Sequence, residues 1–254
     1  MMWEERIRKI LSGYEPITLQ EMDGVRLMDR TDTKFVFSIR ELGGILESVK
    51  PFYRSLEVSG TRVSKYETLY YDTHDLELYS RHHCGKMNRY KIRARKYVES
   101  NLHFFEVKYK NNKGRTIKDR IKTREIETVL SDASKQLLTQ KTTLSPEALK
   151  ATIWVNYSRI TLVNKVSSER LTIDVGLHFM MGEKKVDMGN LVIAEVKQDK
   201  ANSLSPIINV MKAKRIKEGS ISKYCFGIVS MFDTVRKNNF KEKIKATLKI
   251  KEAA

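Results

Sequence analysis

The chain has 254 residues, of which 41% are apolar, and its 48 lysines and arginines against 31 acids give a formal net charge of +17. Two cysteines are too few for a disulfide-stapled scaffold, and no run approaches the roughly 20 apolar residues of a membrane span, so we expect neither of these classes. The charge indicates an acidic partner, which is nucleic acid, an anionic membrane or a phosphate-rich small molecule.

The N-terminal part of the chain predicts a helix, a charged strand and a second helix. Residues 3–13 have the spacing of a short amphipathic helix, and its early acids argue against a signal peptide, so we expect a cytoplasmic protein. Residues 30–37 read as a strand on which Arg30, Asp32 and Lys34 share one face. Ser38 suits the N-cap of the next helix, which Pro51 ends.

Charged residues alternate with apolar ones on the three strands predicted in the middle of the chain. After a β-rich segment over residues 62–72, strands are expected at residues 86–97, 102–110 and 116–122, the last two joined by a hairpin turn. The positions that share one face are Arg89, Lys91, Arg93 and Arg95 on the first strand, Phe104, Glu106, Lys108 and Lys110 on the second, and Thr116, Lys118, Arg120 and Lys122 on the third.

The second half of the chain predicts helices followed by more strands of the same kind. Helical spacing over residues 125–152 precedes strands at 154–163, 169–177 and 191–197, and further helices begin near Ser205 and Ser222. The charged faces of these strands carry Arg159 on the first, Arg170 and Asp174 on the second, and Glu195 and Lys197 on the third. We expect one domain over residues 1–254, with a core at 26–230 and a basic, solvated tail at 234–254.

The repeated pattern has two interpretations. In an ordinary β-sandwich the charged face of each sheet is simply the face exposed to solvent. However, the helices between the strands can cover the apolar faces, single acids recur among the cations, and arginine suits bidentate phosphate binding. We therefore expect an α+β fold, in which about eight antiparallel strands form a closed β-barrel with helices packed outside. Its basic lumen would bind a linear polyphosphate, and its few carboxylates, Glu106, Asp174 and Glu195, would hold a divalent metal.

These residues resemble the polyphosphate-polymerase domain of the vacuolar transporter chaperone (VTC) family, which belongs to the triphosphate tunnel metalloenzymes. The resemblance covers roughly residues 26–230. The motifs that carry it are Arg30-x-Asp32-x-Lys34, Tyr70-Tyr71-Asp72-Thr73, Lys91-Ile92-Arg93-Ala94-Arg95, Phe105-Glu106-Val107-Lys108, Tyr157-Ser158-Arg159, Arg170-Leu171-Thr172-Ile173-Asp174, Glu195-Val196-Lys197 and Ser222-Lys223-Tyr224. Fungal members also carry a phosphate-sensing helical domain and membrane segments, which we do not expect here.

The resemblance implies a tunnel that grips the triphosphate of ATP and a growing polyphosphate chain. The positions that match phosphate-binding positions of the family are Lys34, Arg93, Arg95, Lys108, Arg159 and Lys223, with Lys118 in a looser alignment. Glu195 matches the metal-binding glutamate, which implies Mn²⁺ or Mg²⁺. Arg170, Asp174 and Lys197 fit the motifs, and Arg89 and Lys91 lie on the same face, closer to the expected mouth.

Three functions are compatible with these residues. The first is phosphotransfer from ATP to polyphosphate, in which Arg93, Arg95, Lys108 and Arg159 clamp the triphosphate. The second is hydrolysis of inorganic or nucleoside triphosphate, with Glu106 as the candidate base for water. The third is non-catalytic binding of a polyanion or RNA, although nucleic acid is the less favoured partner. Related triphosphatases and cyclases open with Glu-x-Glu-x-Lys, so the Arg-x-Asp-x-Lys of this chain favours the polymerase.

The histidines suggest a metal site at first sight. His74, His82 and His83 lie near Cys84, but their spacing matches no standard site. We interpret them as solvated loop residues.

Overall fold

Eight strands pair in one continuous path within the part of the chain that the computed structural model describes, which is residues 2–23, 31–198, 204–219 and 221–252. In order of pairing they are β2 (Thr31–Ser38), β11 (Leu191–Gln198), β9 (Arg170–Met181), β8 (Leu149–Asn164), β4 (Ser64–Thr73), β5 (Arg89–Tyr97), β6 (Leu102–Lys110) and β7 (Thr116–Thr123). Every pair along this path is antiparallel, which confirms the predicted α+β class with an antiparallel sheet.

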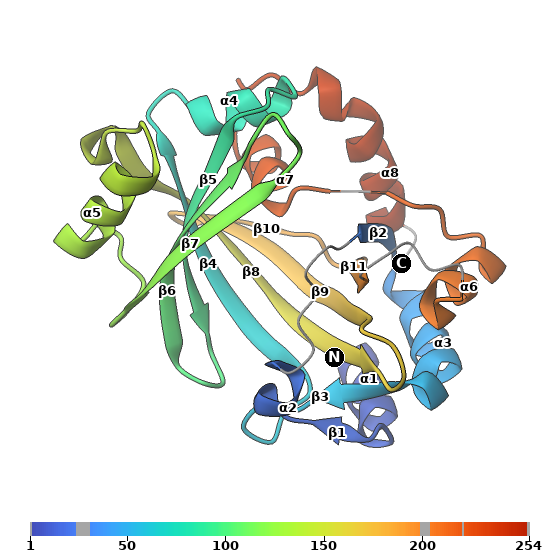
Figure 1. Ribbon diagram of the computed structural model, residues 1–254. Coiled ribbons are helices and arrows are strands. Elements are labelled where there is room, and N and C mark those ends of the chain that lie inside the picture. Colours follow the sequence, from blue (N-terminus) through green and yellow to red (C-terminus); the bar gives the residue numbers. More distant parts are fainter. Residues whose placement is uncertain (1, 24–30, 199–203, 220, 253–254) are drawn as a thin grey trace.

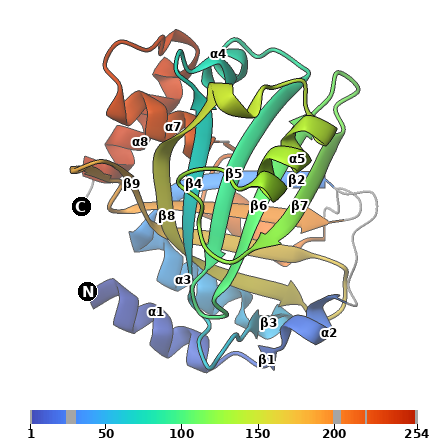
Figure 2. The ribbon, with the colours of Figure 1, turned by 90° about the vertical axis from the view of Figure 1, so that its left-hand side faces the viewer.

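Three short strands, which the sequence did not predict, extend the margins of this sheet. They are β1 (Pro16–Ile17), β3 (Tyr53–Leu56) and β10 (Lys184–Asp187). β10 pairs with β9 and β3 with β8, both antiparallel, whereas β1 pairs with β3 in parallel. Figures 1 and 2 show that the whole sheet is strongly curled.

The expected closure of the barrel is not confirmed. The path ends at β2 and at β7, and no pairing joins these two strands within the described ranges. Part of the edge of β2 is instead taken up by the segment around Gly219, whose N–H donates to the carbonyl of Lys34 at 2.9 Å. Lys34 of β2 and Lys118 of β7 line the same cavity, so the two end strands of the path face a common space without pairing.

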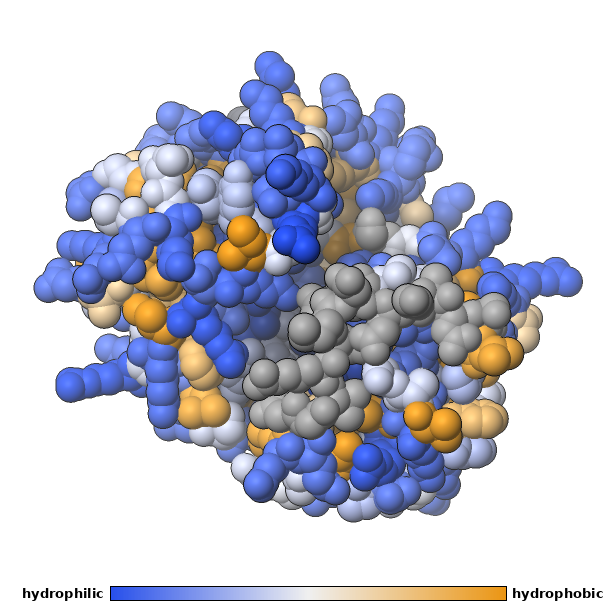
Figure 3. All heavy atoms as spheres, in the orientation of Figure 1, coloured by the Kyte–Doolittle hydropathy of each residue, from blue (hydrophilic) through white to orange (hydrophobic). Residues whose placement is uncertain are grey.

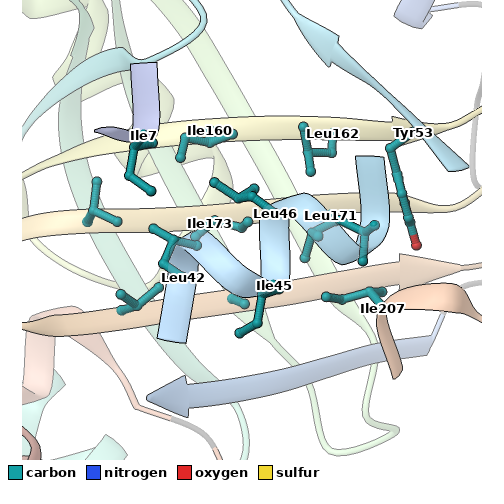
Figure 4. Packing of buried hydrophobic residues seen from close by; sticks show 14 of the residues in the cluster. Ile7, Leu42, Ile45, Leu46, Tyr53, Ile160, Leu162, Leu171, Ile173 and Ile207 are labelled. Atoms are coloured by element: carbon teal, nitrogen blue, oxygen red, sulfur yellow. The ribbon is translucent and has the colours of Figure 1, made fainter. Parts of the chain in front are cut away.

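Helices cover the apolar outer face of the sheet, as predicted. The first group, α1 (Met2–Ser12), α3 (Ile39–Val49) and α6 (Pro206–Ala213), packs on β2, β8, β9 and β11. Figure 4 shows Leu42, Ile45 and Leu46 of α3 against Ile160 and Ile173 of the sheet. At the other end of the sheet, α5 (Asp132–Lys141) covers the outer face of β5 and β6 and lies in front of them in Figure 2. α2 (Leu19–Asp23) lies between β1 and β2 in the chain.

Helix α3 illustrates how local sequence sets these elements. Its apolar stripe has helical spacing, and Leu42, Ile45 and Leu46 are fully buried. Ser38 caps the first turn by accepting the N–H of Arg40 at 3.4 Å. The helix ends at Val49, just before the short 3₁₀ turn η1 (Lys50–Phe52), because the proline at position 51 has no N–H with which to continue the helical hydrogen bonds.

The inner face of the sheet, which carries Arg159 and Asp174, is partly covered by α7 (Lys223–Met231). Ile153 and Phe179 of the sheet pack against this helix in one apolar cluster. The approach is so close that a Cβ on Gly227 would lie 2.8 Å from the Cδ1 of Ile153 and 2.9 Å from the ring of Phe179, so a larger residue would force these side chains to shift. α4 (Glu77–His83) lies beside α7, and the 3₁₀ turn η2 (Pro146–Ala148) precedes β8.

Some sequence expectations differ from the structure at the chain termini. The tail expected to be solvated forms the 3₁₀ turn η3 (Asn238–Phe240) and α8 (Lys241–Glu252), because Phe240, Ile244 and Ile250 give it an apolar side that packs on the α7 cluster. Arg30, expected to begin the first strand, lies outside the described residues. Within the described ranges, none of the helices has the length and apolar character needed to traverse a bilayer.

Candidate functional site

Strand alternation places most of the predicted site residues on the inner face. A bidentate ion pair lies at its centre: Arg159 of β8 donates Nε and Nη2 to the two carboxylate oxygens of Asp174 on β9, at 2.6 and 2.9 Å. Lys223, the first residue of α7, reaches the same carboxylate at 2.5 Å. Although burial opposes ionisation, Arg159 and Lys223 lower the pKa of Asp174 to about 2, so this carboxylate is charged at neutral pH.

A second carboxylate, Glu195 of β11, is held between two lysines. Lys34, its partner on β2, lies 2.7 Å from one oxygen, and Lys197 donates to the other. These two lysines overcome the effect of burial and hold the pKa of Glu195 far below its usual range. Burial in turn lowers the pKa of Lys197.

The third acid, Glu106 of β6, pairs with the predicted clamp residue Arg93 of β5. The Nε of Arg93 lies 2.5 Å from the Glu106 carboxylate, and its Nη1 donates to the Tyr70 hydroxyl at 3.3 Å. Burial works against ionisation of Glu106, but Arg93 and Arg95 more than offset it and lower its pKa. Arg95 itself is buried and donates to the Thr68 hydroxyl at 3.3 Å.

Three lysines lie side by side on β5, β6 and β7. Lys108 is the cross-strand partner of Lys91 on one side and of Lys118 on the other. Burial and the charges of Lys91 and Lys118 lower the pKa of Lys108 to about 7, against a small opposing effect of Glu195. Such a row stores electrostatic repulsion that an anion would relieve.

We expect the affinity of this site for inorganic triphosphate to decrease between pH 6 and pH 8 through Lys108. With a pKa of about 7, Lys108 is mostly charged at pH 6 and mostly neutral at pH 8, and a bound anion favours the charged form, so binding at pH 8 requires proton uptake. The contribution is up to about tenfold in Kd. Because triphosphate itself gains charge over this range, metal-free titration calorimetry would compare the wild type with Lys108→Met. Equal pH dependence in both proteins would contradict the assignment.

The lysine row opens onto a cavity of about 980 Å³, which we call the basic cavity. Among the described residues, its charged lining consists of eight cations, Lys34, Arg89, Lys91, Lys108, Lys110, Arg115, Lys118 and Lys243, and one acid, Asp32. Figure 3 shows hydrophilic side chains gathered around a hollow near the centre of this face. The mouth is therefore strongly positive. Arg93, paired with Glu106, lies further along β5, whereas Arg159, paired with Asp174, lies on β8, which contributes no residue to the described lining of this cavity.

The remaining predicted residues have definite places. Arg89 lies at the rim of the basic cavity and donates to the carbonyl of Lys86 at 2.7 Å. Arg170 is the cross-strand partner of Lys197 and donates to the carbonyl of Met22 at 3.3 Å. Lys91 donates to the Ser222 hydroxyl at 3.0 Å, which links β5 to the start of α7.

Sequence reasoning missed several residues of the site. Tyr66 and Tyr157 stack with ring centroids 5.2 Å apart, and the Arg159 guanidinium lies over both rings, 4.9 Å from the centroid of Tyr66. Tyr157 had a signal, since it alternates with Arg159 on the same strand, whereas Tyr66 lies on β4 and meets Tyr157 only through the pairing of β4 with β8. Lys110 was predicted on the charged face of its strand without being assigned to the site, whereas Lys243 lies in the tail that the sequence predicted to be solvated.

The histidines are only partly as predicted. His74 is exposed, as expected for a loop residue. His82 and His83 instead lie on α4, because this segment forms a helix rather than a loop. His83 is buried and accepts the N–H of Asn239 at 3.3 Å. His82 lines the basic cavity, where burial and then Lys91 and Arg89 lower its pKa to about 2, so it is neutral.

The carboxylates do not assemble a metal centre of their own. No group of three His, Cys, Asp or Glu side chains suited to a metal ion occurs in the described part of the chain. Glu106, Asp174 and Glu195 are each paired with cations instead. Magnesium is commonly bound by one or two carboxylates together with substrate phosphates and water, so a single carboxylate fits an ion that arrives on the substrate.

Comparisons with known proteins bear on the family and the fold. The family model described as the VTC domain matches residues 29–232, close to the span of the predicted resemblance. A putative adenylyl cyclase from Hippeastrum, described as revealing a dominant triphosphatase activity, has a TM-score of 0.54 at 14% identity, over 81% of this chain and 97% of that chain. A putative adenylate cyclase from Bacillus halodurans has a TM-score of 0.47 at 12% identity, over 81% and 100%. A search of curated proteins finds no match.

Proposed function

The chain belongs to the VTC domain family, and on this basis we propose that it is a metal-dependent polyphosphate polymerase that transfers the γ-phosphate of ATP to a growing polyphosphate chain. The observation that carries the proposal is the basic cavity, whose described lining has eight cations and one acid, with the ion-paired Arg93 further along β5. Phosphoryl transfer depends mainly on positioning and charge neutralisation, which such a surface supplies.

In this proposal the existing ion pairs hold the cations in place before the substrate binds. Arg93, Arg95, Lys108 and Arg159 contact the triphosphate, and the carboxylates of Glu106 and Asp174 keep the two paired arginines oriented. The further phosphate contacts are Lys34, Arg89, Lys91, Lys118, Arg170, Lys197 and Lys223. A terminal oxygen of the polyphosphate chain attacks the γ-phosphorus, the bond between that phosphorus and the β–γ bridging oxygen breaks, and ADP leaves.

A divalent cation, Mn²⁺ or Mg²⁺, would neutralise charge on the phosphate oxygens, with Glu195 as its protein ligand. Glu195 is charged at neutral pH and is already oriented by Lys34 and Lys197. Those two lysines can transfer their contacts to phosphate when the carboxylate turns to a metal.

The second candidate function is hydrolysis of a triphosphate, which the likeness of fold to the Hippeastrum protein brings into consideration. Water, unlike a phosphate chain, is a neutral acceptor and benefits from a general base. Glu106 is a poor base, because Arg93 holds it ionised with a lowered pKa. A phosphate acceptor is already anionic at neutral pH, so the pairing favours the polymerase.

The third candidate, RNA binding without catalysis, receives little support from the aromatic residues. Tyr90 stacks on Tyr109, with ring centroids 4.7 Å apart, on the face opposite the arginines. It is therefore engaged in packing rather than presented to a base.

Incubation of the purified protein with ATP and Mn²⁺ tests the proposal. We expect ADP and a polymer that polyphosphate stains and that exopolyphosphatase digestion removes. Release of orthophosphate with no polymer would assign hydrolysis instead. Binding of polyphosphate with no turnover in either metal would assign the non-catalytic class.

A further inference from the structure

A buried carboxylate outside the basic cavity organises two helices at once. Asp72, in the Tyr70–Thr73 motif at the end of β4, is fully buried. It accepts the N–H groups of Leu78 at 2.8 Å and Tyr79 at 2.9 Å, both in the first turn of α4. The N-cap of α4, Leu76, has a left-handed φ of 56° and no capping side chain. Asp72 therefore supplies the cap from outside the helix.

The same carboxylate also holds α7. The Tyr224 hydroxyl donates a hydrogen bond to Asp72, and burial together with that carboxylate raises the pKa of Tyr224, so the hydroxyl stays protonated. The Tyr224 ring stacks on Tyr70 at 4.9 Å between centroids, and the Tyr70 hydroxyl accepts from Arg93. A chain of contacts thus runs from Asp72 to one of the clamp arginines.

The start of α7 delivers two groups to the inner face. Lys223 precedes Tyr224 in the chain and reaches the Asp174 carboxylate, and Ser222 receives the hydrogen bond of Lys91. The other contacts of α7 belong mainly to an apolar cluster, whose packing at Gly227 sets how closely the helix approaches the sheet but is less directional about its rotation and its position along its axis. A hydrogen bond to a buried carboxylate is directional and does fix them.

We propose that Asp72 and Tyr224 are positioning residues, which hold the start of α7 so that Lys223 and Ser222 meet a bound phosphate chain. Neither residue lines the basic cavity. The inference rests on the proposed phosphate contact of Lys223 and is independent of whether the phosphate acceptor is polyphosphate or water.

The test is a double-mutant cycle read by metal-free titration calorimetry with inorganic triphosphate. Tyr224→Phe removes only the hydroxyl, and we expect it to weaken binding by about fivefold in the wild-type background. In the Lys223→Ala background we expect it to have no further effect on Kd, since the group that it positions is gone. Asp72→Asn, which keeps the shape of the side chain, should show the same dependence on Lys223 and replaces Tyr224→Phe if that variant does not fold.

Tyr53→Phe is the matched control, because Tyr53 also donates to a buried carboxylate, that of Glu169, but within the cluster outside the sheet. It should lower the Tm and leave Kd unchanged. A purely stabilising role for Tyr224 would give the same result as this control, or equal losses of affinity in both backgrounds, and would overturn the proposal. Absence of triphosphate binding by the wild type would overturn it as well. Binding without polymer formation would refute only the polymerase.

Discussion

Replacing Arg159 with alanine is expected to reduce turnover of ATP by roughly 100-fold and also to destabilise the fold. The guanidinium makes two charge-assisted hydrogen bonds to Asp174, and it is the central cation of the inner face. Loss of such a contact to phosphate costs about 1.5–3 kcal/mol, which corresponds to a loss of roughly 10- to 100-fold. Removing Arg159 also leaves the buried Asp174 with Lys223 as its remaining ion-pair partner, at a cost of about 3 kcal/mol.

Steady-state kinetics and urea unfolding separate these two effects. Arg159→Lys keeps the charge but loses the bidentate geometry, so it should recover part of the stability and little of the activity. Arg54→Ala is the control, because Arg54 lies on the short strand β3 outside the basic cavity, forms a looser ion pair with Glu21 at 3.7 Å and should change stability by less than about 1 kcal/mol. Full activity in a folded Arg159→Ala protein would remove Arg159 from the clamp.

The second large effect is expected for Glu195→Gln, which should abolish turnover without weakening the binding of metal-free triphosphate. As the proposed metal ligand, Glu195 is needed only when the cation is present. Without the metal, the substitution removes a negative charge held by Lys34 and Lys197, and both lysines become more available to phosphate. We therefore expect equal or tighter binding in EDTA, with turnover in Mn²⁺ lowered by roughly 100-fold or more.

The pH dependence of the wild type provides an independent check on this role. The pKa of Glu195 lies far below its usual range, so lowering the pH to 5 should not reproduce the effect of the substitution. Glu41→Gln serves as the control and should retain activity, because it breaks only the ion pair between Glu41 of α3 and Lys214. Normal turnover of Glu195→Gln in Mn²⁺ would exclude Glu195 as the metal ligand.

The inner face could be predicted from sequence because side-chain alternation along a strand is a property of the backbone. On each strand, the charged residues are spaced two positions apart. Arg93, Glu106 and Arg159 belong to three such sets, and the structure places them on one face. The apolar residues between them required cover, which the predicted helices supply. The outer core and the direction of the cations were therefore accessible from local patterns.

The ion pairs were not accessible in the same way, because they depend on which strands become neighbours. Asp174 lies four positions after Arg170 in the sequence, yet its partners are Arg159 of β8 and Lys223 of α7. Closure of the barrel depends on the two end strands, and local patterns contain no information about the distance between them. The burial of His83 likewise follows from the packing of α4, whereas the sequence had suggested histidines in a solvated loop.

The pairing of β2 with β11 has a consequence for how the protein folds. β5, β6 and β7 follow one another in the chain and can pair as soon as they are made. The pairing of β2 with β11, by contrast, joins residues as far apart in the sequence as Thr31 and Gln198. Contacts so distant in sequence carry a large loop-closure cost and slow folding, and the unpaired edge of β2 is open to aggregation meanwhile. Lys34 meets Glu195 only across this long-range pairing, so we expect the proposed metal ligand to gain that contact late in folding.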